Sequence, residues 1–194
     1  MAEVDGPNGP PGCWPEFADA RFGLFLRYWA ERRTGLAMPR RAIDPTILKP
    51  CLPHVYLMRY DAAADLFVCT LSGEKINEAW GTSLMHKTPQ QFMAAPAAAR
   101  AQRIYRRIVT EPAVHVGHRH RGAAGETAAK AADRLVVPLC DDAGRPWGLF
   151  GLSLYHFNPV TEAEVAPHIG PEVTYYPCKD LPRDPPPASL PPRG

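Results

Sequence analysis

Three histidines close together form the most conspicuous group of side chains that could do chemistry in this sequence. They occur as His115-Val-Gly-His118-Arg-His120. On a β-strand, His118 and His120 would share one face of the sheet, while His115 would point to the other face. Two imidazoles on one strand face can hold zinc, but a closed site needs about four ligands. The segment therefore predicts a solvated polar strand face, a pH-sensitive polar wall, or part of a metal site whose other ligands are not evident nearby.

A basic stripe is the second candidate. Arg100, Arg103 and Arg107 recur at helical spacing, with Arg106 beside them. Such a stripe could contact an acidic partner or a phosphate-bearing ligand, although a solvated helix face is the simpler explanation. No G-x-S-x-G elbow, P-loop or G-x-G-x-x-G motif accompanies it. We therefore expect no catalytic residues and no enzymatic activity.

The bulk charge and the cysteines restrict the class of protein. The chain has 22 basic and 20 acidic residues, a formal charge of +2, which is too balanced to indicate a nucleic-acid or membrane partner. No secretory signal and no long apolar run are present. The five cysteines are scattered without a C-x-x-C pair, which favours reduced thiols in a cytoplasm.

Proline divides the chain into three parts. Many of its 23 prolines lie in the first fifteen residues and after residue 158. Because proline fixes φ and lacks an N–H, we expect residues 1–15 and 159–194 to be extended or disordered. Residues 16–158 then form one domain, including an N-terminal helix.

That helix is predicted over Glu16–Arg33. Phe22, Phe25 and Trp29 repeat at helical spacing and make one apolar stripe. The stripe can pack on the chain's own sheet, or it can form a dimer or partner interface. The sequence leaves both alternatives open.

The remaining elements predict an α+β fold. β-Forming runs cover residues 54–60, 66–71, 113–121, 134–140 and 147–155, and helical patterns cover 74–80 and 97–110. A helical turn at 89–93 and a short helix after Asp44-Pro45 complete the pattern. Two groups of strands with helices between them favour an antiparallel sheet with helices on one face.

The order of these elements, together with several short runs of residues, resembles a proteobacterial PAS family that often occurs as small stand-alone proteins. The likeness spans about residues 20–156. The runs that carry it are Phe25–Trp29, Pro39–Pro45, Leu52–Val55, Phe67–Gly73, Trp80–Gly81 and Leu135–Leu139.

The resemblance implies a five-stranded antiparallel sheet with a pocket between the sheet and the intervening helices. It also implies a sensory or protein-interaction role, with a homodimer through the helix before the first strand. Core packing alone would explain the apolar candidates for this pocket. The candidates are Trp80, Phe92, Ile104, Ile108 and Leu152, with His118 and His120 as polar members.

Neither of two common PAS cofactors fits the sequence. Haem-binding PAS domains commonly carry a histidine on the long helix, and Ala97–Thr110 contains none; His86 lies in the segment before it. The Asn-Cys-Arg motif of flavin photosensors is also missing. The cofactor therefore stays unknown.

We predict a PAS-type sensory or adaptor module that binds a small ligand or a protein partner and relays a signal. The alternative is a small-ligand-binding or metal-dependent α+β enzyme that uses His118 and His120.

Overall fold

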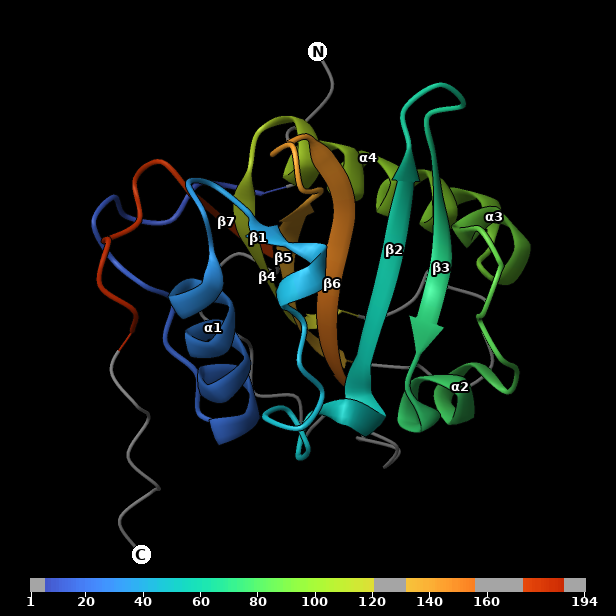
Figure 1. Ribbon diagram of the computed structural model, residues 1–194. Helices are drawn as coiled ribbons and strands as arrows, with labels where there is room; N and C mark the ends of the chain where they lie inside the picture. The colour runs from blue at the N-terminus through green and yellow to red at the C-terminus, as the bar shows by residue number, and fades with distance from the viewer. Residues whose placement is uncertain (1–5, 121–131, 156–172, 187–194) are drawn as a thin grey trace, which may run out of the picture.

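A twisted sheet forms the centre of the protein (Figure 1). The structure is a computed structural model that describes residues 6–120, 132–155 and 173–186. Six strands follow the order β3-β2-β6-β5-β4-β7, all antiparallel to their neighbours, and β1 pairs parallel with β5. The strands are β1 Met38–Pro39, β2 Val55–Asp61, β3 Leu66–Ser72, β4 Ala113–His120, β5 Ala132–Cys140, β6 Pro146–Tyr155 and β7 Val173–Pro177.

Helices cover both faces of this sheet. α1 packs on one face, and α2, α3 and α4 pack on the other, so that α1 and α4 lie on opposite sides in Figure 1. The α+β class, the antiparallel sheet and the N-terminal helix are confirmed. The sheet has two strands more than the expected five. The helices are α1 Ala20–Arg32, α2 Glu74–Trp80, α3 Pro89–Phe92 and α4 Ala95–Thr110, with the 3-10 helices η1 Arg40–Ala42 and η2 Leu52–His54.

The central strands β5 and β6 read as nearly continuous apolar runs because both of their faces are buried. Alternation divides their side chains between two cores. Leu135 and Val137 face α1, whereas Val136 faces the layer of α2 and α4. The sheet therefore lies between two apolar clusters.

The apolar stripe of α1 packs on the chain's own sheet. Phe22, Phe25 and Trp29 are each at most 3% exposed, and the ring of Phe25 lies 4.5 Å from that of Phe150. The helix begins four residues later than Glu16 because the Asp19 carboxylate caps it by accepting the N–H of Arg21. A homodimer through this helix stays a prediction, and it would have to use side chains other than these three.

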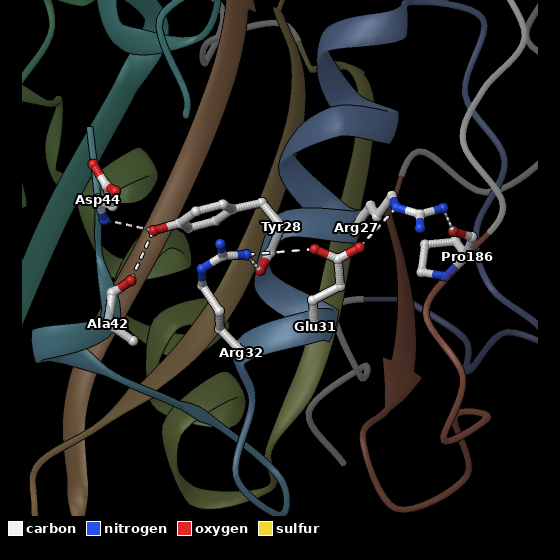
Figure 2. A network of polar contacts seen from close by, with 7 residues as sticks. All are labelled: Arg27, Tyr28, Glu31, Arg32, Ala42, Asp44 and Pro186. Carbon is white, nitrogen blue, oxygen red and sulfur yellow. Dashed lines mark hydrogen bonds and ion pairs between the residues drawn. The ribbon is translucent and has the colours of Figure 1, made fainter. Parts of the chain in front are cut away.

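A tyrosine fixes the segment that follows α1. The Tyr28 hydroxyl donates to the carbonyl oxygen of Ala42 at 2.8 Å and accepts the N–H of Asp44 at 2.5 Å (Figure 2). The expected helix after Asp44 is absent: residues 45–50 form turns. The Asp44 carboxylate accepts both the N–H and the hydroxyl of Thr46, which is a turn rather than a continuing helix.

The C-terminal region corrects the expectation for residues 159–194. Part of that region, 173–177, is strand β7, paired with β4. Val173 and Tyr175 are buried on one face of β7, and this alternation outweighs the flanking prolines. The N-terminal segment is held as well, since Gly9 N–H donates to the carbonyl of Tyr175 and Tyr175 N–H donates to that of Pro7. Residues 1–5, 156–172 and 187–194 lie outside the described residues.

Side-chain donors also hold residues 182–186 along α1. Arg33 donates to the Pro182 carbonyl at 2.6 Å, and the Trp14 indole donates to the Asp184 carbonyl at 3.0 Å. Arg27 donates to the Pro186 carbonyl at 3.2 Å (Figure 2). Alternate carbonyls therefore accept from side chains on or next to α1 and from the N-terminal segment, which suits a proline-rich chain because its carbonyls remain free to accept.

The packing of α1 makes a testable prediction. Trp29 is fully buried, and its indole N–H donates to the carbonyl of Pro138 at 3.0 Å. Replacing Trp29 with Phe removes this donor and leaves a void, so we expect Trp29→Phe to lower the free energy of unfolding by about 2 kcal/mol. Urea denaturation measures the change. The matched Trp147→Phe, at a partly exposed indole, should cost about 1 kcal/mol or less. Equal stability of the two variants would contradict the packing of α1 on the sheet.

Candidate functional site

A small cavity lies between the sheet and helices α2–α4. Its volume is about 30 Å³, room for a few water molecules. Small-molecule pockets usually measure roughly 300–1,000 Å³, so only a compact ligand fits without side-chain movement. Its walls come from four strands, three helices and the loops between them. The lining residues are Tyr56, Met58, Cys69, Trp80, Leu84, Phe92, Met93, Tyr105, Arg134, Ser153 and Tyr155.

The helical wall of the cavity is aromatic. Trp80, the last residue of α2, meets Phe92 of α3 edge to face, with 5.2 Å between ring centroids. α2 ends at this point because Gly81 adopts a left-handed conformation with φ of 65°. The Trp80 indole N–H donates to the Tyr155 hydroxyl oxygen at 2.8 Å. This bond connects the end of α2 to the end of β6, and both residues line the cavity.

Two further tyrosines face each other across the cavity, one from the sheet and one from α4. The hydroxyl groups of Tyr56 on β2 and Tyr105 on α4 share a hydrogen bond. The ring of Tyr56 lies against Gly151 of β6, where a Cβ atom would come within 2.2 Å of the ring. Burial, more than any other cause, raises the pKa of Tyr56 well above its usual value and also raises the pKa of Tyr105. Both phenols therefore stay neutral at ordinary pH.

One guanidinium faces these hydroxyls. Arg134 lies on β5 opposite Ser153 of β6, and its guanidinium carbon is 6.0 Å from the ring centroid of Tyr155. Burial lowers the pKa of Arg134, but Tyr155, Tyr56 and Tyr105 raise it by more, so the net shift is upward. Arg134 also hydrogen-bonds Tyr155. The side chain therefore stays charged within a mainly aromatic surround.

The structure separates the predicted pocket residues. Trp80 and Phe92 line the cavity; Ile104 and Ile108 are buried in the same core cluster but do not line it. Leu152 is buried on the opposite face, against the α1 layer. Its position follows from alternation in β6, where residues 151, 153 and 155 face the cavity. The side chains of His118 and His120 lie outside the described part of the chain.

Sequence reasoning missed the polar members of the cavity. Tyr56 and Tyr155 lie in apolar runs and Arg134 lies next to one, and their common face depends on the pairing of β2, β5 and β6. Tyr105 comes from α4, where arginines flank it in the sequence. One signal was available: Arg134 begins a buried apolar strand, where an unpaired charge is costly and calls for a partner.

The other predicted groups lie elsewhere. His115 is 4% exposed and meets Tyr175 edge to face at 5.2 Å between centroids. In the basic stripe, Arg106 pairs with Asp65, and Arg107 bonds Gly6 and Asn8 of the N-terminal segment. Among the side chains that the structure describes, which exclude His118 and His120, no cluster of three His, Cys, Asp or Glu residues could hold a metal ion.

The cysteines give a prediction on reactivity. Cys13 is exposed, whereas Cys51, Cys69, Cys140 and Cys178 are buried. Burial raises the pKa of Cys51 and Cys69 to about 11 and that of Cys178 to about 12, and it raises the pKa of Cys140 as well. Only the thiolate reacts, and a thiol with pKa about 11 is ionised to roughly one part in a thousand at pH 8. An aromatic disulfide reagent should therefore modify one thiol rapidly in the native protein.

The Cys13→Ser variant should lose this rapid phase, and the four buried thiols should react only after denaturation. A second rapid thiol in native Cys13→Ser would show that one of the buried sites is open to solvent.

The contact between Tyr56 and Gly151 gives another prediction. Gly151→Ala would push a methyl group into the Tyr56 ring, so we expect it to destabilise the fold by about 1–3 kcal/mol. Tyr56→Leu in the same chain should relieve this overlap, so the double variant should be more stable than the sum of the single changes predicts. Urea denaturation of the four proteins in the cycle measures the coupling. Additive changes would contradict the contact.

Comparison with known proteins gives the family. No curated protein gives a significant match. Solved structures of VqmA are similar in part: "VqmA bound to DPO" has 19% identity and a TM-score of 0.43, covering 58% of this chain and 56% of that one. A Vibrio cholerae VqmA dimer without target DNA has 19% identity and a TM-score of 0.43, covering 58% and 50%.

A Vibrio VqmA–ligand–DNA complex has 20% identity and a TM-score of 0.43, covering 57% of this chain and 49% of that one. The chain thus spans about half the length of these solved relatives. No helix in the described ranges is both long and apolar enough to cross a bilayer. The PAS_5 profile, described as a PAS domain, matches residues 21–154, which is more than half of the chain, and the protein therefore belongs to this PAS domain family.

Proposed function

We propose that this PAS domain is a sensory module that binds a compact ligand in the cavity between the sheet and α2–α4. One observation carries the proposal: an aromatic-walled cavity contains several hydroxyl groups and one guanidinium. Such a combination of apolar walls with a few polar groups is typical of small-molecule sites. Core packing alone would leave no reason for a charged side chain on this wall.

The signal would pass through β6 to the N-terminal helix. Tyr56 touches Gly151 on the cavity side of β6, and the adjacent Phe150 packs against Phe25 of α1 on the other side. A ligand that moves the Tyr56 ring would shift β6 and so alter the packing of α1 on the sheet. The ligand can bias this equilibrium only by its difference in affinity for the two arrangements.

The output would be a contact with another protein, in the manner of an adaptor. α1 presents a charged outer surface to such a partner: Arg27 pairs with Glu31, and Arg32 lies over the ring of Tyr28 (Figure 2). A homodimer through this surface is one form the contact could take. The free cysteines among the described residues suit a reducing compartment, and we place the protein in the cytoplasm.

Blocking the cavity tests ligand binding. Ser153 is 1% exposed and lines the cavity, so Ser153→Leu would fill it, whereas Ser83→Leu adds the same group at an exposed loop position. We would screen both variants and the parent protein by ligand-observed NMR against neutral, anionic and cationic compounds of about ten non-hydrogen atoms or fewer. We expect at least one compound to bind the parent and Ser83→Leu and to bind Ser153→Leu at least about tenfold more weakly.

Hydrogen exchange tests the relay. A compound that binds the cavity should change amide exchange in residues 20–32 as well as in β2 and β6, because α1 rests on β6. Binding that Ser153→Leu leaves intact, or an absence of binding by every compound, would contradict the ligand site. Binding without any change in α1 would contradict the relay alone.

A further inference from the structure

The charge balance of the cavity indicates what kind of ligand it takes. Arg134 extends from β5 on the face opposite to its neighbour Asp133, which lies across from Leu154 of the α1-side core. Among the described residues, the groups that act on the Arg134 guanidinium are the three tyrosines Tyr155, Tyr56 and Tyr105. No described carboxylate forms an ion pair with it.

The tyrosines do not supply the missing negative charge. Burial raises the pKa of Tyr56 and of Tyr105, so both phenols are neutral where the guanidinium is fully charged. The Tyr155 oxygen already accepts the Trp80 indole N–H. The described wall of the cavity therefore carries one positive charge solvated by neutral dipoles. Such a charge, partly removed from water, is strongly stabilised by an anion at bonding distance.

The planar shape of the Arg134 guanidinium limits which class of anion fits it. A guanidinium presents parallel N–H groups that match the two oxygens of a carboxylate. Ser153, opposite Arg134 in the ladder, can donate one more hydrogen bond. A single cation balances a single negative charge, which favours a carboxylate over a dianionic phosphate.

The size and walls of the cavity limit the rest of the ligand. A volume of about 30 Å³ fits only a few non-hydrogen atoms in the present arrangement. Met58 and Met93 also line it, and unbranched methionine side chains can move to admit a slightly larger group. The edge-to-face pair of Trp80 and Phe92 offers an apolar, aromatic surface to that group.

We propose that the cavity binds a compact monocarboxylate whose carboxylate pairs with Arg134 and whose short apolar or aromatic remainder lies against Trp80 and Phe92. This inference rests on the proposed function, because it specifies the chemical class of ligand for the same site. The carboxylate would supply the counter-charge that the described residues do not give the guanidinium, and its affinity would come mainly from that pair.

Matched acids and amides test the proposal. The probes are propionate and benzoate, with propionamide and benzamide as neutral controls of nearly the same shape. Their binding to the parent protein, Arg134→Met, Arg134→Lys and Arg59→Met would be measured by titration calorimetry and ligand-observed NMR. Arg59 is an exposed arginine on β2 and serves as the matched control.

We expect the parent and Arg59→Met to bind at least one acid at least about tenfold more tightly than its amide. Arg134→Met should lose this preference, and Arg134→Lys should keep part of it, since an ammonium retains the charge but not the paired N–H groups. Thermal unfolding controls for the fold. Arg134→Met should still unfold in one cooperative transition, at a temperature somewhat below that of the parent, because it loses the hydrogen bond to Tyr155.

The outcomes separate this inference from the proposed function. If amides bind as tightly as acids, or if Arg134→Met keeps the preference for the acid in a folded protein, the carboxylate proposal is wrong while the cavity remains a ligand site. If Arg134→Met does not fold, Arg134→Lys decides: full retention of the preference would overturn the paired contact. If neither these probes nor the broader panel bind, the proposed function itself fails.

Discussion

The pairing of β5 with β6 is the constraint on which the rest of the molecule depends. This ladder runs from Ala132 opposite Tyr155 to Cys140 opposite Pro146, and it is buried on both faces. Strict alternation along it sends Leu152 and Leu154 to the α1 side and leaves Ser153 and Tyr155 for the cavity. A shift of the register by one residue would exchange these two sets. The lining of the cavity and the surface on which α1 packs are therefore both set by the register of β5 with β6.

Glycine at two positions of β6 permits this arrangement. Gly148 has a φ of 153°, and a Cβ there would lie 2.0 Å from the carbonyl oxygen of Met58. Gly151 leaves room for the ring of Tyr56. In both places β2 approaches β6 more closely than side chains would allow. The position of Tyr56, and with it the sheet wall of the cavity, thus depends on the absence of two side chains rather than on an attractive contact.

The spacing of apolar residues was enough to predict the helices and strands whose buried face is visible in their own sequence. The predicted helix 74–80 matches α2, and the long helix and five strands agree within a few residues. β7 escaped prediction because its two inward residues, Val173 and Tyr175, form a short alternation among prolines, and only pairing with β4 makes a strand of it. Among site residues, Trp80 and Phe92 could be found from aromatic type and helical position. For Arg134 the sequence offered only a charge beside a buried apolar strand, and the face to which it points depends on the pairing of β5 with β6.

The position of charged Arg134 on the cavity wall bears on function. Buried ion pairs can often be replaced by apolar side chains without loss of stability, so core packing does not by itself require a charged side chain on this wall. The guanidinium instead lies among neutral hydroxyl groups that favour its charged form, on the wall of a cavity where no described carboxylate pairs with it. Local conflicts of this kind occur chiefly at functional sites, where a ligand completes the interaction. If the proposed carboxylate site is correct, a small cavity can still be selective, because one charged group discriminates between an acid and its amide more sharply than an apolar wall could.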